Sequence, residues 1–241
     1  ADDLVGNFVR ASHWGYDEMV SKLGKPIDKD EWFMTPQTVN AYYNPVNNEI
    51  VFPAAILQPP FFNMAAEDAV NYGGIGAVIG HEIGHGFDDQ GAKYDGDGNL
   101  RNWWTEQDKA QFQARGAKLI GQYNRFEPLP GVNVNGAVAL GENIGDLGGL
   151  GIAVVAFKNY CADKGIDLQG KEETFEVDGA EPELAEHTYN GLQRFFLAWA
   201  RVWRTAIRPE MATQYLAIDP HSPAEFRCNL IAANIAEFYE A

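Results

Sequence analysis

The stretch that most constrains this chain is His81-Glu82-Ile83-Gly84-His85. It follows the apolar run 76–80, and such a run predicts a helix on which residues four apart share one face. Both imidazoles would then point the same way and could take two corners of a zinc site. Glu82 could act as a general base without binding the metal. The pattern alone is only moderately specific, because two ordinary histidines on a half-buried helix would look the same.

Three glycines lie in or beside this predicted helix, at positions 80, 84 and 86. Each is about 1 kcal/mol less favourable than alanine inside a helix. We therefore expect another backbone to pack closely against this segment.

A second helix-like run, 140–157, offers the third ligand that a zinc site needs. Glu142 and Asp146 are again four residues apart, and a catalytic zinc ion commonly binds two histidines and one glutamate. Asp146 is placed to accept the second ring proton of His81, and Asp88 that of His85. The alternative is that Glu142 and Asp146 only complement the dipole of a helix N-terminus.

Five motifs together resemble the catalytic domain of the neprilysin and endothelin-converting-enzyme family of zinc metallopeptidases. They are NAYYNP, PPFF, HEIGHGFDDQG, GENIGDLGGL and DPHSPAEFR, and they occur in the family's order. The resemblance implies a thermolysin-like zincin domain, mainly α with a small mixed β-sheet (α+β). The low number of cysteines indicates a bacterial member.

The resemblance also implies roles for individual residues. One Zn²⁺ ion would be held by His81, His85 and Glu142, with Glu82 as the base. His221 would stabilise the transition state, Asp146 would orient His81, and Arg227 would hold the substrate backbone. His221 and Arg227 match the family's last motif in type and spacing.

Substrate contacts follow from the resemblance in the same way. Asn40 and Ala41 would contact the peptide. The residue after the scissile bond would enter a pocket lined by Ile56, Phe61, Val78, Val202 and Trp203. Core packing is the alternative for any one of these. Ala77 stands where the family often has Met, and we expect it to make this pocket roomier.

The function implied is a zinc-dependent endopeptidase that cleaves oligopeptides on the amino side of bulky hydrophobic residues. Two alternatives belong to other classes. One is a zinc-binding but inactive interaction domain. The other is a calcium-stabilised structural domain built on residues 95–106, which resemble an EF-hand loop but carry Leu100 where that loop needs glycine.

The composition of the chain limits the classes of partner that it is expected to bind. The chain of 241 residues has 46% hydrophobic residues, enough for a large core, and a formal net charge of −16. Such acidity disfavours nucleic acids and anionic membranes as partners and leaves peptides as the expected substrates. No run of about 18 apolar residues is apparent, so we expect no transmembrane helix.

The expected organisation is a helix and linker over residues 1–31 and a zincin catalytic domain over residues 32–241, truncated at its C-terminus. Both ends suggest a fragment that lacks a helical cap domain, which would be a partner from the same full-length chain. An extracytoplasmic location in a bacterium is expected. Cys161 and Cys228 are expected to be free thiols.

Other local patterns predict elements around the site. Residues 38–52 indicate a β-hairpin, and Thr105 is expected to cap a helix that starts at Glu106. A long helix is expected from Glu181 to the Arg208-Pro209 pair. Residues 231–241 are expected to form a final helix.

Overall fold

The structure is a computed structural model that describes residues 3–170 and 188–241, so the helix start expected at Glu181 lies outside the described residues. The chain divides into two compact units, Ala1–Phe33 and Met34–Ala241. The first contains α1 (Leu4–Ser21), which is capped by the Asp3 side chain and has no buried residue. A helix was predicted here, and one is present.

The second unit begins with the predicted hairpin. Strands β1 (Tyr42–Asn44) and β2 (Glu49–Val51) pair antiparallel, with Tyr43 opposite Ile50. Asn48, in the turn, has φ of +50°, a conformation that asparagine tolerates better than most residues. The sheet in the described part of the chain is therefore a two-stranded antiparallel ribbon rather than the mixed sheet expected.

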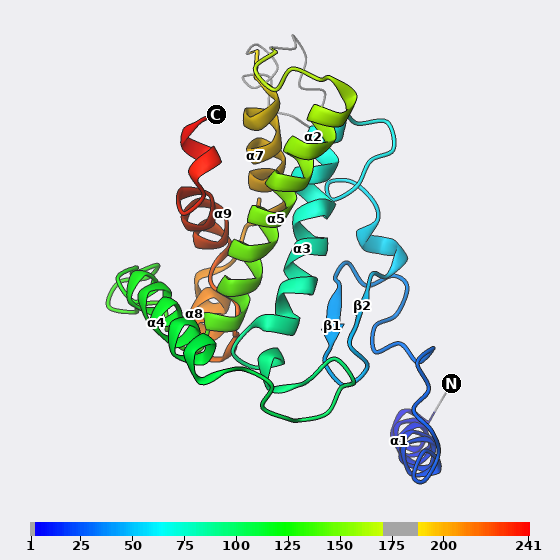
Figure 1. Cartoon of the computed structure of the whole chain (residues 1–241). Helices are drawn as coiled ribbons and strands as arrows, with labels where there is room; N and C mark the ends of the chain where they lie inside the picture. The colour runs from blue at the N-terminus through cyan, green and yellow to red at the C-terminus, as the bar shows by residue number, and fades with distance from the viewer. Residues whose placement is uncertain (1–2, 171–187) are drawn as a thin grey trace. The chain divides into compact units, whose positions relative to one another are not determined.

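Two helices at the centre of the unit carry the predicted metal ligands. The short α2 (Asp68–Asn71) runs through a π-helical turn (Tyr72–Gly76) into α3 (Ala77–Gly84). The long α5 (Leu140–Lys164) lies beside α3 (Figure 1). Glycines make this approach possible, because a Cβ on Gly80 would lie 2.6 Å from the carbonyl oxygen of Gly149. The close backbone contact predicted from the glycines of α3 is confirmed.

The hydrophobic core forms where α5 meets α7 (Gly191–Val202) and α9 (Ala224–Ala233). Leu150 of α5, Phe195 and Trp199 of α7 and Ile231 of α9 are each at most 1% exposed. Side chains on α5 recur three or four residues apart in this core. The core thus fixes α5, and with it Glu142, against the rest of the unit.

The ends of α7 differ from the prediction. The helix begins after Asn190, whose side chain forms a capping box with Gln193. It ends at Val202 rather than at Arg208, and Pro209 is the first residue of a separate helix, α8 (Pro209–Ile218). Proline is well suited to the first position of a helix, because an N–H group there has no hydrogen-bond acceptor within the helix. The final helix is also interrupted: α9 stops at Ala233 and a 3₁₀ turn (Ala236–Tyr239) follows.

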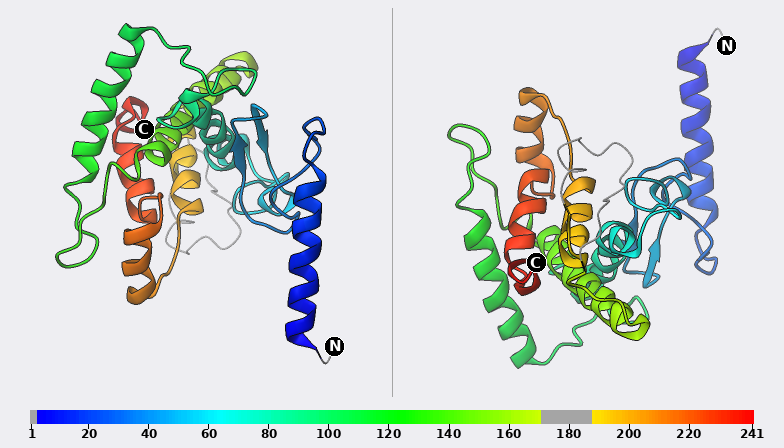
Figure 2. Two further views of the ribbon diagram at one scale, coloured as in Figure 1. Left: turned by 90° about the horizontal axis from the view of Figure 1, so that it is seen from below. Right: turned by 90° about the horizontal axis from the view of Figure 1, so that it is seen from above.

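Helix α4 (Glu106–Tyr123) lies alongside α9 in both views of Figure 2, and Gln122 and Asn234 exchange side-chain hydrogen bonds between them. Thr105 caps α4 as predicted, accepting the Asp108 N–H at 3.1 Å. Shorter 3₁₀ turns occupy Ala54–Ile56, His85–Phe87 and Gly91–Lys93.

The acidic loop before α4 is a turn held by its own carboxylate. Asp95 accepts the N–H groups of Asp97 and Asn99, both at 3.0 Å, and pairs with Arg101 at 2.9 Å. Gly98 has φ of +80°, and a Cβ there would lie 1.8 Å from the Val46 carbonyl oxygen. In these contacts the Asp95 carboxylate bonds to groups of its own segment.

Two further expectations concern the cysteines and the possibility of a membrane-spanning helix. Cys161 and Cys228 are both free, as predicted. Helix α5, however, is long and apolar enough to cross a membrane by length and composition, although no such run was expected. Its residues Leu150, Val154 and Phe157 are buried in the core, and core helices meet the same criterion.

Candidate active site

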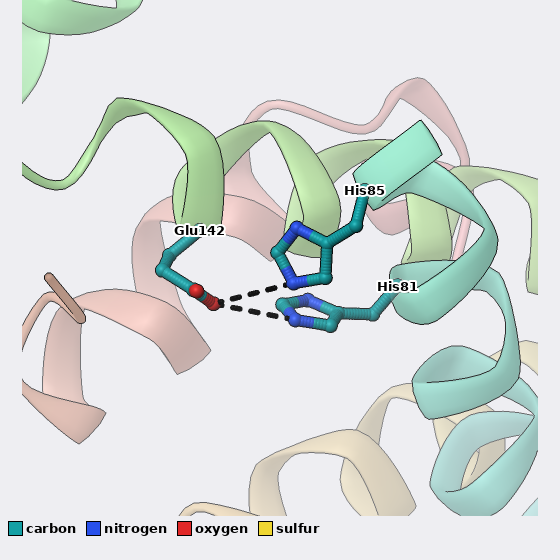
Figure 3. Close-up of side chains that lie close together, drawn as sticks. All are labelled: His81, His85 and Glu142. Atoms are coloured by element: carbon teal, nitrogen blue, oxygen red, sulfur yellow. Dashed lines mark ion pairs between the residues drawn. The ribbon is translucent and has the colours of Figure 1, made fainter. Parts of the chain in front are cut away.

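Three side chains from α3 and α5 converge at the predicted metal site. Figure 3 shows the imidazoles of His81 and His85 facing the carboxylate of Glu142. His81 Nε2 lies 3.3 Å and His85 Nε2 3.7 Å from Glu142 Oε2. One ligand atom from each residue lies within 4.8 Å of the others, and this is the one such group among the described residues.

This cluster fits a zinc ion. Ligand atoms about 2.1 Å from one tetrahedral zinc ion lie about 3.4 Å apart, close to the two distances from the Glu142 oxygen. That oxygen is buried and accepts no well-oriented hydrogen bond from the described residues. Two neutral imidazoles and a carboxylate are a common donor set for a catalytic zinc site.

Both histidines contact a carboxylate through their other ring nitrogen. His81 Nδ1 lies 2.8 Å from Asp146 Oδ1, and His85 Nδ1 lies 2.7 Å from Asp88 Oδ2. Both pairs were predicted from spacing. They leave each Nε2 facing Glu142, as a metal ligand requires.

Charges in the metal-free cluster follow from these contacts. Burial lowers the pKa of His81, but the carboxylates of Asp146 and Glu142 outweigh it and raise that pKa to about 10. Burial alone would raise the pKa of Glu142, yet the imidazoles of His221 and His81 bring it well below its usual range. Metal binding therefore has to displace a proton from His81.

Glu82 points its carboxylate toward the same cavity as the ligands. Its side chain is buried, and Oε2 has no hydrogen-bond partner among the described residues. Burial raises the pKa of Glu82, although the nearby histidines oppose the shift. The result is a carboxylate without a competing partner and with increased basicity.

His221 approaches from the loop between α8 and α9. Its Nε2 lies 3.1 Å from Glu142 Oε2, and its Nδ1 lies 2.7 Å from Asp219 Oδ1. The close contact of its Nε2 with the Glu142 carboxylate raises the pKa of His221, while burial opposes it. Sequence analysis gave Asp219 no role, although an aspartate two residues before the histidine was a visible signal.

A second contact fixes this loop on α5. The buried Ser222 hydroxyl donates to Asn143 Oδ1 at 2.9 Å, next to the ligand Glu142. Neither Ser222 nor Asn143 was singled out from the sequence. Nothing in a serine before a proline indicates a partner 79 residues away.

Arg227 is in the cavity wall but its guanidinium has an additional role that was not predicted. Nε and Nη2 form two bonds with Asp146, at 2.7 and 2.8 Å. The same group stacks on the Trp203 ring, 4.1 Å from its centroid. Arg227 thus holds the aspartate that contacts His81, besides lining the cavity where substrate is expected.

The cavity over the cluster has a volume of about 750 Å³. Six of the predicted substrate contacts line it besides Arg227: Asn40, Ala41, Ile56, Phe61, Val78 and Trp203.

Two residues named for the pocket do not line this cavity. Val202, the last residue of α7, packs against the main core, and Trp199 lines the cavity. Ala77 is fully buried in the main core and is not in the cavity wall, so it does not widen the pocket.

Comparison with known proteins gives consistent matches over the whole chain. The chain is 41% identical to human neprilysin over 242 residues and 42% identical to bovine endothelin-converting enzyme 1 over 234 residues. It covers 30% and 29% of those proteins, and they cover 100% and 97% of it.

Solved structures agree. The chain superposes on the zinc metalloprotease Zmp1 of Mycobacterium tuberculosis, in complex with an inhibitor, with a TM-score of 0.87 and 54% identity. It superposes on PepO of Lactobacillus rhamnosis with a TM-score of 0.82 and 36% identity. All of this chain is covered, against 35% and 34% of the two neighbours.

A family model, described as Peptidase family M13, matches residues 40–241. The match includes the ligand cluster, Glu82 and the His221 loop. The chain therefore belongs to peptidase family M13.

Proposed function

We propose that this chain carries the catalytic machinery of a zinc-dependent endopeptidase that cleaves oligopeptides on the amino side of bulky hydrophobic residues. The supporting observation is one arrangement: a buried, unpaired carboxylate of Glu82 beside the converging ligand atoms of His81, His85 and Glu142, under a 750 Å³ cavity. A structural metal site does not need an additional base facing a cavity.

The three ligands would hold one zinc ion. When bound, it supplies a Lewis acid that polarises a carbonyl group and makes water more acidic. Asp146 and Asp88 keep the two imidazoles oriented through their Nδ1 atoms.

Glu82 and His221 are the residues that handle charge in the reaction. Glu82 accepts a proton from the attacking water and passes it to the leaving amine, and its raised pKa suits both transfers. His221 donates a hydrogen bond to the oxygen that becomes negative, and Asp219 fixes its ring through Nδ1.

Shape supports the proposed preference. Ile56, Phe61 and Val78 belong to one apolar cluster and line the cavity together, which suits a bulky hydrophobic side chain after the scissile bond. Asn40 and Ala41, just before β1, line the cavity and are placed to contact an extended peptide.

The chain spans about 30% of the length of the relatives it matches. We therefore propose that a cap domain in the same full-length protein partners this catalytic domain and limits the size of its substrates.

The test is hydrolysis of a quenched fluorescent peptide with Phe after the scissile bond. Activity should be lost to a chelator, return with zinc, and be absent in Glu82→Gln while zinc content is unchanged. Glu106→Gln, which makes the same change on an exposed part of α4, is the control. Stoichiometric zinc without turnover would favour an inactive zinc-binding domain. Chelator-resistant activity in Glu82→Gln would refute the mechanism.

A further inference from the structure

A second cavity adjoins the cleft and has no role in the chemistry above. It lies between α4 and the segment 92–104, has a volume of about 560 Å³, and is here called the α4 groove. Its apolar walls come from Leu100, Trp104, Phe112, Ile120 and Leu140. The rings of Trp104 and Phe112 lie 5.3 Å apart. Both its size and its apolar lining are typical of ligand pockets.

The rim of the α4 groove is basic, although the chain as a whole is strongly acidic, with 34 Asp and Glu against 18 Lys and Arg. Lys93, Arg101 and Lys109 line it, with Asp89 as its one carboxylate. Arg101 is paired with Asp95, whereas Lys93 bonds the neutral Gln90. Within residues 3–170 and 188–241, neither Lys93 nor Lys109 forms an ion pair with a carboxylate. An acidic ligand therefore gains two cationic partners here.

Asp89 lines both the catalytic cleft and the α4 groove. Its Oδ1 atom is buried and accepts no hydrogen bond from the part of the chain that the structure describes. A buried acceptor without a donor is unfavourable. Asp89 is thus the residue at which the catalytic cleft and the α4 groove meet.

The geometry of α3 gives the direction of a peptide that passes from the cleft into the groove. Val78, at the apolar pocket, lies in α3, and the 3₁₀ turn His85–Phe87 continues the chain from the end of α3 to Asp88, the neighbour of Asp89. At the usual rise of these two kinds of helix, this segment is about 15 Å long. The two histidine ligands lie between Val78 and Asp88. If the residue after the scissile bond occupies the pocket, residues before the bond extend toward Asp89. An extended chain covers about 15 Å in four or five residues.

From this arrangement we propose that the α4 groove binds the amino-terminal part of longer peptide substrates, about four residues before the scissile bond. It takes a bulky apolar side chain flanked by acidic residues. The apolar side chain packs between Trp104 and Ile120, and the acidic residues face Lys93 and Lys109. The proposal rests on the function proposed above, which assigns the cleft to peptides.

The test compares peptides that share the residues around the scissile bond but differ in length. The short peptide starts one residue before the bond, and the long peptide adds a Glu-Leu-Glu segment at the proposed distance. Affinity is measured by fluorescence anisotropy with the scissile amide replaced by a methyleneamine, so that binding does not depend on turnover. Hydrolysis of the ordinary peptides is measured in parallel.

Two variants fill or recharge the groove without touching the catalytic residues. Ala117→Trp places a large side chain in it, and Ala114→Trp makes the same change on the same helix outside it. Lys109→Glu reverses a rim charge, with Lys118→Glu as its control outside the lining.

We expect Ala117→Trp to weaken binding of the long peptide about tenfold, the effect of losing one buried apolar side chain. Lys109→Glu should weaken it about threefold. The short peptide and both controls should be unchanged. Equal effects on both peptides, or none on the long peptide, would overturn the groove proposal. Failure to cleave either peptide while the affinity difference persists would refute the peptidase function and leave the groove assignment standing.

Discussion

Two neighbouring glycines of α5 should respond oppositely to the same substitution. A Cβ on Gly149 would lie 2.4 Å from the His81 backbone nitrogen and 2.7 Å from the Ala77 carbonyl oxygen. A Cβ on Gly148 would meet nothing within 4 Å. Both residues are inside the same helix, so Gly148→Ala isolates the gain in helix propensity and Gly149→Ala adds the collision with α3.

The magnitudes follow from these contacts. Alanine is favoured over glycine in a helix by about 1 kcal/mol, and this gain is all that Gly148→Ala should show. In Gly149→Ala the atoms that are too close belong to backbone, so α3 has to move by about 1 Å. Overpacking of this kind costs about 3 kcal/mol at the upper end of its usual range. The net result is a loss of about 2 kcal/mol, and the two variants should differ by about 3 kcal/mol.

Urea unfolding of the chelated proteins measures this difference without a contribution from metal. In a domain of this size, the loss in Gly149→Ala corresponds to a fall in Tm of about 5 °C. Zinc titration should also show weaker binding in Gly149→Ala, because His81 moves with α3, and unchanged binding in Gly148→Ala. If both variants are equally stable, the close approach of α3 and α5 does not limit residue size, and the reasoning is wrong.

Three other outcomes are expected. Ser222→Ala removes the hydrogen bond that fixes the His221 loop to Asn143, so kcat should fall about tenfold with little change in KM. Ser222→Thr keeps the hydroxyl and should restore kcat, and an effect on KM alone would contradict this positioning role. Arg227→Met removes the two bonds from the guanidinium to the buried Asp146 and leaves His81 as its charged partner, so it should destabilise the chain by about 3 kcal/mol in urea unfolding. Asp146→Asn in the same background should recover part of this loss, and full additivity would contradict the pairing. In the metal-free chain the free energy of unfolding should fall from pH 6.5 toward pH 10. Folding raises the pKa of His81 to about 10, so the folded state binds a proton over this range that the unfolded state has lost, and this stabilisation disappears as the pH approaches 10. Urea unfolding in the presence of a chelator measures it, and a rise in the free energy of unfolding over this range would refute the prediction.

The cluster was predictable from sequence because its spacing is local. Four-residue spacing places His81 with His85 and Glu142 with Asp146 on common helix faces, whatever the rest of the fold. The pair formed by Asp88 and His85 is local in the same sense. The glycines at 80, 84 and 86 also carried information, since residues with poor helix propensity in and beside a predicted helix indicated a close backbone contact.

Contacts between distant segments could not be predicted in this way. The two bonds from Arg227 to Asp146 join residues 81 positions apart, and spacing within one helix says nothing about them. Val202 was assigned to the pocket through the family resemblance, which carries over a residue's role but does not show how this side chain packs, and here it lies against the main core. The boundary at Pro209 was misread because a proline that ends one helix and a proline that starts the next look alike.

The glycines and the metal ligands both depend on how closely α3 and α5 approach each other. Gly80 and Gly84 precede the two histidines by one residue, and Gly141, Gly145 and Gly149 continue the same spacing on α5. Adjacent residues differ by about 100° around a helix, so one face makes the backbone contact and the next presents the ligands. The separation of the helices therefore sets the 3.3 and 3.7 Å distances from the Glu142 oxygen to the histidine nitrogens. Two ligands of one zinc ion need about 3.4 Å, and a shift of 1 Å would exceed what that geometry allows. Larger residues at these glycines should consequently reduce zinc affinity even where no ligand is changed.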